Sequence, residues 1–272
     1  MTDWEEAGVS VRLYGPVAEV NLCDTEHNNG ITPGLRDRLP RALDFACAQP
    51  PTRVVILTGR PDVFCSGGTL EDLAAPGPPR APLAWDFVTS PLTCPLPVIV
   101  AAQGHAIGGG LLLALYADLT ILSDRSSYAA NFLSYGFTPC LGATYLVPSA
   151  LGPVLGHEML YTARPYRGRE LAARGAGTLT VPHSTVLERA RHSAGRMAQA
   201  PRPSLELLKR QIAPLRLQAA HAAFQRELPD HAATLASPQT RQLLGGASAR
   251  WSGSTDPSPA PLRPPHDNQA GS

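Results

Sequence analysis

The sequence has little excess charge of either sign and almost no lysine. Lys209 is the only lysine, and 23 basic residues against 22 acidic ones leave a formal net charge of +1. Proteins that bind nucleic acid generally carry an excess of positive charge gathered in a patch or stripe. The balance therefore argues against a nucleic-acid partner, and it gives no sign of a patch for a membrane surface.

Long apolar runs and paired cysteines are also missing. The longest apolar candidate, residues 107–122, is interrupted by a run of glycines and by Asp118, so we expect no transmembrane helix. The five cysteines form no Cys-x-x-Cys pair, which argues against a zinc site and against a disulfide framework. The N-terminus lacks the basic and apolar regions of a signal peptide. These absences predict a cytoplasmic protein.

The N-terminal part of the chain predicts a hairpin followed by a helix. Residues 9–13 and 16–22 read as two short strands joined at Gly15. Thr32 followed by Pro33 is typical of a helix start, and apolar residues recur at helical spacing over the next turns.

Continuous apolar runs further on predict strands that are buried on both faces. They are residues 53–59, 97–102 and 119–123. Such strands, separated by helical or irregular crossovers, are typical of a mostly parallel sheet covered by helices, so the expected fold class is α/β. From Ala143 onward the pattern is mainly helical, with a short strand near residues 178–181.

Three regions are expected along the chain. Residues 1–200 would form the main α/β unit, and residues 201–245 a helical C-terminal region interrupted near Pro214. Residues 246–272 are rich in proline and hold almost no large apolar side chain, which predicts a disordered tail. A second proline-rich stretch, residues 74–82, has the composition of either a binding loop or a plain linker.

Two glycine-rich turns follow two of the predicted strands. Residues 64–69 read Phe-Cys-Ser-Gly-Gly-Thr, and residues 104–111 contain three consecutive glycines. Glycine lets a bare backbone N–H approach a ligand, so two such turns can direct two amides at one oxygen, as an oxyanion hole requires. Close packing of a helix on a strand explains a glycine run equally well. Neither turn has the pattern of a nucleotide phosphate loop.

The order of these turns resembles the crotonase, or enoyl-CoA hydratase/isomerase, superfamily. Phe-Cys-Ser-Gly-Gly followed by Pro-Val-Ile-Val-Ala-Ala-Gln-Gly-His-Ala-Ile-Gly-Gly-Gly carries the resemblance, which runs from about Val9 to Leu243. It implies a crotonase (ClpP/crotonase-like) spiral of βαβ units with a helical C-terminal trimerisation region. In that superfamily the positions of Gly68 and Gly109 supply the amides that hold the enolate of a thioester.

The chain departs from the hydratases of this superfamily at their two glutamates. Leu112 and Phe132 stand at the matching positions, after the glycine run and in Ala-Asn-Phe-Leu-Ser-Tyr-Gly-Phe. Adding water needs a general acid and a general base within hydrogen-bond reach, and these side chains are neither. A dry apolar pocket instead favours loss of CO2, because a carboxylate is destabilised relative to a charge-delocalised transition state.

One branch of the superfamily matches more closely, the decarboxylating homologues of polyketide β-branching (HMG-synthase) cassettes. The matching segments are FCSGGTLEDL, GHAIGGGLLL, ANFLSYGFTPCLGATY, EMLYTARPYRGREL and ELPDH. The resemblance implies decarboxylation of a 3-methylglutaconyl-type thioester on an acyl carrier protein, with or without a preceding dehydration. Phosphopantetheine or CoA would carry the substrate, no metal or other cofactor is implied, and a homotrimer or hexamer is expected.

That branch places a lysine in the loop after the first glycine turn and a histidine near the C-terminal helix. His231, after Pro229 at an expected helix break, is the matching histidine and would orient the carboxylate or protonate the dienolate. Arg80 falls where the lysine would lie; arginine can hold a carboxylate in a bidentate fork but cannot give up a proton. The expected catalytic residues are Gly68, Gly109, His231 and Arg80. The expected substrate-binding residues are Cys65, Ser66, Gly67, Thr69, Leu112 and Phe132.

Two alternatives remain open from the sequence. An isomerase or hydrolase of the same fold would need an acid or base such as Glu71 or Asp72, although a helix start favours acidic residues in any case. A non-catalytic acyl-carrier-binding scaffold would keep the fold without the chemistry, and the two intact glycine turns count against it. His105 is interpreted as structural, and Tyr135 and Tyr161 as packing residues.

Overall fold

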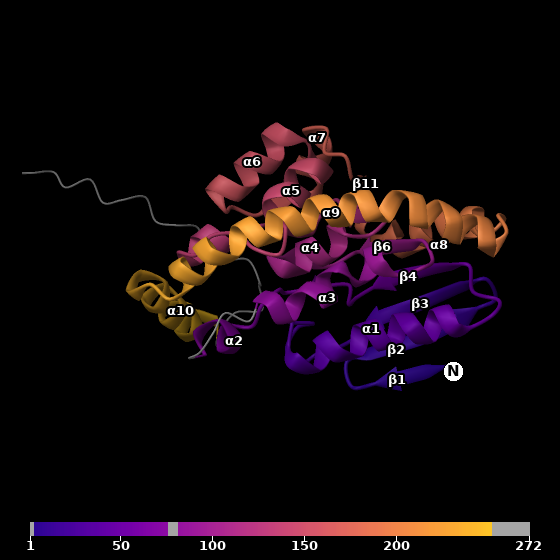
Figure 1. Cartoon of the computed structure of the whole chain (residues 1–272), viewed down its shortest axis with the longest axis horizontal. Helices are drawn as coiled ribbons and strands as arrows, with labels where there is room; N and C mark the ends of the chain where they lie inside the picture. The colour runs from indigo at the N-terminus through magenta and orange to yellow at the C-terminus, as the bar shows by residue number, and fades with distance from the viewer. Residues whose placement is uncertain (1–2, 76–80, 252–272) are drawn as a thin grey trace, which may run out of the picture.

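The computed structural model describes residues 3–75 and 81–251. Its larger sheet has seven strands in the order β1-β2-β3-β4-β6-β8-β11 (Figure 1). The first three strands pair antiparallel, and the pairs from β3 onward are parallel. The strands are β1 Trp4–Glu6, β2 Val9–Tyr14, β3 Val17–Leu22, β4 Val54–Thr58, β6 Val98–Ala102, β8 Leu119–Ser123 and β11 Leu179–Val181.

A second sheet of four short strands has the order β10-β9-β7-β5. These strands are β5 Val63–Cys65, β7 His105–Ile107, β9 Ser127–Ala129 and β10 Tyr166–Arg167. Along the chain, β5 follows β4, β7 follows β6 and β9 follows β8, so each turn of the chain adds one strand to each sheet. This repetition builds the spiral of βαβ units that was expected from the sequence.

Ten α-helices within the described residues cover the sheets (Figure 1). They are α1 Pro33–Ala48, α2 Leu70–Ala74, α3 Ala81–Thr93, α4 Gly109–Leu115, α5 Ala143–Leu151, α6 Pro153–Thr162, α7 Gly168–Ala173, α8 Val186–Met197, α9 Arg202–Leu235 and α10 Pro238–Trp251. The long helix α9 crosses the molecule, and α10 at its end packs against α2.

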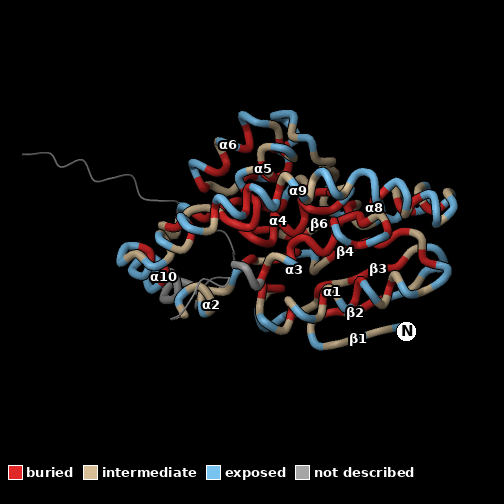
Figure 2. Tube along the Cα trace, viewed as in Figure 1, coloured by how far each residue is buried: buried red, intermediate tan, exposed pale blue. Residues whose placement is uncertain are grey.

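The central strands are buried on both faces, as their continuous apolar runs predict (Figure 2). Successive side chains of a strand point to opposite faces. Val55 and Leu57 of β4 therefore enter the main core, whereas Val54 and Ile56 enter a smaller core under α8. The hairpin, α1 with Thr32 as its N-cap, the buried strands and β11 all confirm the predicted elements.

The predicted helix breaks at Pro214 and Pro229 are wrong, because α9 is continuous through both residues. A proline inside a helix removes one backbone hydrogen bond and costs about 3 kcal/mol. Tertiary packing offsets that cost: Ala220, Phe224 and His231 are buried along the same helix.

The C-terminal boundary differs from the expected one. Helix α10 continues to Trp251, into the segment predicted as a tail. Residues 252–272 lie outside the described residues, and the division of the chain into three regions stays a prediction. No helix within the described residues is long and apolar enough to span a bilayer.

Candidate active site

The two glycine turns meet because the strands before them are neighbours. β5 and β7 pair in parallel, so their carboxyl ends lie at the same edge of the small sheet. Gly67 has a φ of +83°, and a Cβ atom there would lie 2.4 Å from the carbonyl oxygen of Ile107 and 3.4 Å from the amide nitrogen of Gly109. Only glycine fits this left-handed, crowded position.

The amides of Gly68 and Gly109 are the two candidate oxyanion donors. Gly68 precedes the N-cap of α2, and Gly109 is the first residue of α4. Both residues line one cavity. Neither amide donates a hydrogen bond to another residue in the described part of the chain. Two N–H groups without an internal partner on one cavity wall are what an oxyanion needs.

The glycine run serves packing as well as amide exposure. A Cβ atom on Gly110 would lie 2.2 Å from the carbonyl oxygen of Cys65, so Gly110 lets α4 approach β5 closely. A Cβ atom on Gly109 would instead meet the end of the Ile31 side chain at 2.6 Å. Both interpretations of the run therefore hold, at neighbouring positions.

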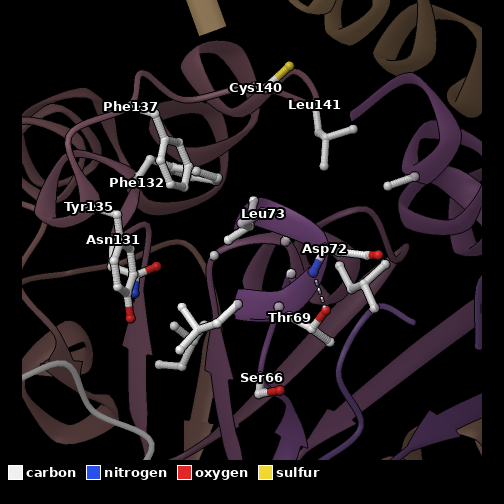
Figure 3. A pocket seen from close by; sticks show the side chains of 18 of the residues that line it. Ser66, Thr69, Asp72, Leu73, Asn131, Phe132, Tyr135, Phe137, Cys140 and Leu141 are labelled. Atoms are coloured by element: carbon white, nitrogen blue, oxygen red, sulfur yellow. Dashed lines mark hydrogen bonds between the residues drawn. The ribbon is translucent and has the colours of Figure 1, made fainter. Parts of the chain in front are cut away.

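The cavity has a volume of about 280 Å³ and mainly apolar walls. In Figure 3, Phe132, Tyr135 and Phe137 gather on one side, with Thr69 and Asp72 on the other. The Phe137 ring stacks on Tyr135 and meets Phe132 edge to face, with ring centroids 6.2 Å apart in both pairs. Phe132, which the resemblance places at the position of a hydratase glutamate, is thus part of an aromatic wall.

His231 packs against this aromatic wall from α9. Its ring lies edge to face with Phe137, and the residue is 4% exposed. Its Nδ1 atom lies 2.7 Å from the carbonyl oxygen of Thr138. Because a carbonyl can only accept, Nδ1 carries the hydrogen and Nε2 of the neutral ring keeps its lone pair. Burial lowers the pKa of His231, against the opposing effects of this hydrogen bond and the charge of Glu227.

Glu227 fixes the segment of α9 that carries His231. Its buried carboxylate accepts hydrogen bonds from the Gly142 amide (2.7 Å), the Thr144 amide (2.8 Å) and the Thr144 hydroxyl (2.6 Å). These bonds satisfy amides at the start of α5. Sequence reasoning missed Glu227, although a glutamate four residues before His231 shares its helix face.

The opposite side of the cavity is polar. Thr69 caps α2 by accepting a hydrogen bond from the Asp72 amide at 3.1 Å. The Asp72 carboxylate lies 3.2 Å from Nη1 of Arg36, which comes from α1. Arg36 was also missed from the sequence, because α1 and α2 are separated by two strands.

Most predicted site residues come together around the cavity. Ser66, Gly67, Gly68, Thr69, Gly109, Phe132 and His231 all line it. Cys65 and Leu112 do not, because both are fully buried in the core. Burial raises the pKa of the Cys65 thiol to about 12, which leaves it protonated. Arg80 lies outside the described residues.

Several residues that were interpreted as structural can also be placed. Nδ1 of His105 accepts from the Ser127 amide at 2.8 Å and so links β7 to β9. Tyr135 lines the cavity in addition to stacking on Phe137. The packing interpretation of Tyr161 is wrong within this chain, since the residue is 80% exposed on α6.

The single lysine of the chain does not line the cavity. Lys209 is buried in α9, where it pairs with Asp118 and donates to the Pro91 carbonyl at 2.9 Å. Asp118 also accepts from the Val98 amide at 2.7 Å, at the start of β6. This lysine is therefore a structural residue. Within the described residues, no cluster of three His, Cys, Asp or Glu side chains could hold a metal ion.

Comparison with known proteins relates this chain to decarboxylases. The bacillaene synthase decarboxylase PksI of Bacillus subtilis is 38% identical over 238 residues, covering 87% of this chain and 95% of that protein. The ECH2 decarboxylase domain of CurF from Lyngbya majuscula superposes with a TM-score of 0.81 at 32% identity, covering 89% of this chain and 100% of that one.

A further solved structure comes from a dehydratase/decarboxylase enzyme couple involved in polyketide β-branching. It superposes with a TM-score of 0.80 at 37% identity and covers 88% of this chain and 95% of its own. The family model for enoyl-CoA hydratase/isomerase matches residues 12–242. Two abutting glycine turns, the two-sheet spiral and this match over most of the chain make it a member of the enoyl-CoA hydratase/isomerase family.

Proposed function

We propose that this protein is a decarboxylase acting on a 3-methylglutaconyl-type thioester, carried on an acyl carrier protein during polyketide β-branching. One observation carries the proposal: Gly68 and Gly109 line a mainly apolar cavity, and Phe132 is on its wall at the position where the resemblance places a hydratase glutamate. The relatives PksI and CurF ECH2, both named decarboxylases, support it. The arrangement favours stabilising an enolate over adding water.

The reaction follows from the placement of the two amides. The thioester oxygen accepts hydrogen bonds from Gly68 and Gly109, and the bond from the chain to the distal carboxylate breaks. Its electron pair passes through the carbon–carbon double bond to the thioester oxygen, CO2 leaves, and the two amides hold the dienolate. A proton then completes the product. Each such donor contributes about 10²-fold or more in rate.

His231 is proposed as the source of that proton. Burial of the ring lowers the pKa of His231 below its ordinary value. A bound carboxylate favours the protonated ring, whose Nε2–H can orient the carboxylate and then transfer its proton to the dienolate. Solvent restores the proton after product release. His231→Ala is expected to abolish most turnover. Arg80→Ala tests the sequence-based prediction that this arginine contacts the substrate, and loss of turnover is the expected result.

The deciding experiment is mass spectrometry of a carrier protein loaded with the 3-methylglutaconyl group. Enzyme-dependent loss of the mass of CO2 is the expected result. An unchanged mass with carrier protein bound would favour the scaffold alternative, and loss of the whole acyl group would favour a thioesterase. Loading the hydroxylated precursor in a parallel reaction tests whether dehydration precedes CO2 loss in this site.

The expected assembly is also proposed here. Val154, Tyr161 and Leu215 are large apolar side chains with 70% or more of their surface exposed in the single chain. Their exposure supports a homotrimer or hexamer that covers them, which sedimentation equilibrium can test. We further propose a cytoplasmic location and no cofactor beyond the carrier's phosphopantetheine; the five free cysteines agree with a reducing compartment.

A further inference from the structure

Arg36 is the single Lys or Arg among the described residues that line the cavity. Its side chain is only 12% exposed, although a guanidinium is charged at any ordinary pH. Charged side chains taken out of water need partners of opposite charge. Asp72 is one such partner, with its carboxylate 3.2 Å from Nη1.

Backbone hydrogen bonds hold Arg36 in register with the oxyanion donors. The Ile31 amide donates to the carbonyl oxygen of Gly67 at 2.8 Å, so the segment before α1 is bonded to the first glycine turn. Thr32 caps α1 and accepts from the Arg36 amide at 3.0 Å. Ile31 thus contacts Gly67, the neighbour of Gly68, and Arg36 follows Thr32 by one helical turn.

The guanidinium has hydrogen-bonding capacity left over. Nη1 bonds to Asp72, whereas Nε and Nη2 donate to no other residue that the structure describes. A guanidinium has five N–H donors arranged to bind carboxylates in pairs. A mostly buried guanidinium on a cavity wall with donors unused can accept a second carboxylate from a ligand.

We propose that Arg36 binds the distal carboxylate of the substrate and shares its guanidinium between that group and Asp72. The inference rests on the proposed function, since it needs a thioester with an acid at its far end. Gly68, Gly109, Asp72 and Arg36 line the same cavity, so one ligand can reach both the amides and the guanidinium. Arg36 thus supplies, from α1, the cation that the sequence assigned to Arg80.

Sharing Arg36 between Asp72 and the substrate carboxylate affects the rate of CO2 loss. A carboxylate held by a whole guanidinium would be stabilised in the ground state, and CO2 loss would slow because that charge disperses in the transition state. Asp72 competes for the same guanidinium. Arg36 can therefore bind the substrate carboxylate without fully neutralising its negative charge. Arg36 then mainly sets KM, and Asp72 limits how much ground-state stabilisation lowers kcat.

The test measures binding of two unreactive ligands by calorimetry. Glutaryl-pantetheine thioester ends in a carboxylate, and butyryl-pantetheine is the same chain with hydrogen in its place. The wild-type enzyme is expected to bind the glutaryl ligand more tightly. Arg36→Gln is expected to weaken glutaryl binding about tenfold or more and leave butyryl binding unchanged. Arg36→Lys, which keeps the charge but not the fork, is expected to fall between them.

Arg41→Gln is the matched control, because Arg41 lies on the same helix but pairs with Glu6 and Asp37 at the surface. It is expected to bind both ligands like the wild type. Asp72→Asn is a second variant that does not remove the cation; it frees Arg36 and is expected to tighten glutaryl binding several-fold while lowering kcat. Circular dichroism melting checks that each variant folds.

A glutaryl preference that survives in Arg36→Gln, or a wild-type enzyme with no such preference, overturns the proposal. Weaker glutaryl binding in Asp72→Asn would count against the shared guanidinium in the same way. Neither ligand can form a dienolate, so these results do not depend on turnover. An enzyme that prefers the glutaryl ligand but releases no CO2 from the loaded carrier would refute the proposed reaction and leave the Arg36 site standing.

Discussion

The ring of His231 and the carbonyl of Thr138 are joined by a hydrogen bond of 2.7 Å in which Nδ1 is the donor. The bond fixes one tautomer and leaves Nε2 as the atom that can exchange a proton with a ligand. Thr138 directly follows Phe137 in the chain. Its hydrogen bond to His231 therefore also orients the His231 ring edge to face with Phe137.

Acid is expected to destabilise the wild-type protein partly through His231. Burial lowers the pKa of this residue in the folded state below its ordinary value near 6.5. As pH falls from about 6.5 towards the folded pKa, the unfolded chain binds the proton first, so the free energy of unfolding decreases. His231→Gln removes this dependence. Urea unfolding at pH 7.5 and 5.5 should show a smaller loss of stability in the variant, and equal losses in both proteins would contradict the assignment.

Replacing two adjacent glycines by alanine is expected to have different effects: Gly110→Ala should lower stability, and Gly109→Ala should lower activity. Gly110→Ala drives a methyl group into the backbone of Cys65, so it should lower the free energy of unfolding by roughly 1–3 kcal/mol or more. Gly109→Ala keeps its N–H but pushes the movable end of Ile31, which lines the cavity, so the fold should survive while substrate binding and CO2 release weaken about tenfold or more. Urea denaturation and the carrier-protein assay separate the two effects. Equal stability of both variants would show that Gly110 does not hold α4 against β5.

Glu227→Gln is expected to weaken both the fold and the catalytic site. An amide cannot accept from both Gly142 and Thr144, and its NH2 group faces a buried donor, which should cost about 1–3 kcal/mol of stability. Removing the negative charge should also lower the pKa of His231 further and move the acidic limb of the pH–rate profile downwards.

Glu206→Gln is the control for that variant, because Glu206 lies on the same helix and pairs with Arg202 near the surface. Such a pair contributes about 0–1 kcal/mol, so the control should match the wild type in stability and in pH–rate profile. A Glu227→Gln variant with an unshifted pH profile would limit Glu227 to a purely structural role.

Phe132→Glu restores a carboxyl group at the position where hydratases carry glutamate. The new side chain would sit against Phe137 in an apolar wall, so its pKa should rise and the fold should lose stability. Decarboxylation is expected to fall at least tenfold, because a nearby negative charge repels the substrate carboxylate. Liquid chromatography of the acyl groups released from the carrier measures this loss and any gain of hydrated product. Undiminished decarboxylation would show that Phe132 is remote from the acyl chain.

The sequence predicted those features that depend on local pattern. The apolar runs around Val55 and Val100 identified strands buried on both faces, and the glycines identified where backbone must approach backbone. The continuity of α9 through Pro229 could not be predicted from local pattern, because long-range packing overrides the local cost of a proline.

Contacts between side chains that are distant in the sequence could not be predicted from it either. Arg36 and Asp72 meet because Ile31 is bonded to Gly67, a contact between segments that no periodicity reveals. The environment of Cys65 was misjudged for a related reason. A residue beside a ligand-facing turn can still point away from it, and Cys65 points into the core.

Both proposed oxyanion donors belong to the main chain and are aligned by the pairing of β5 with β7. A main-chain N–H is lost only when proline is introduced, and changing a glycine codon into a proline codon requires more than one base change. The charge-stabilising part of the site is therefore protected against deletion by single point mutations. The side chains around it, such as Phe132 and Arg36, remain free to vary, so a lineage with this fold can change its reaction while its enolate-binding element is inherited intact.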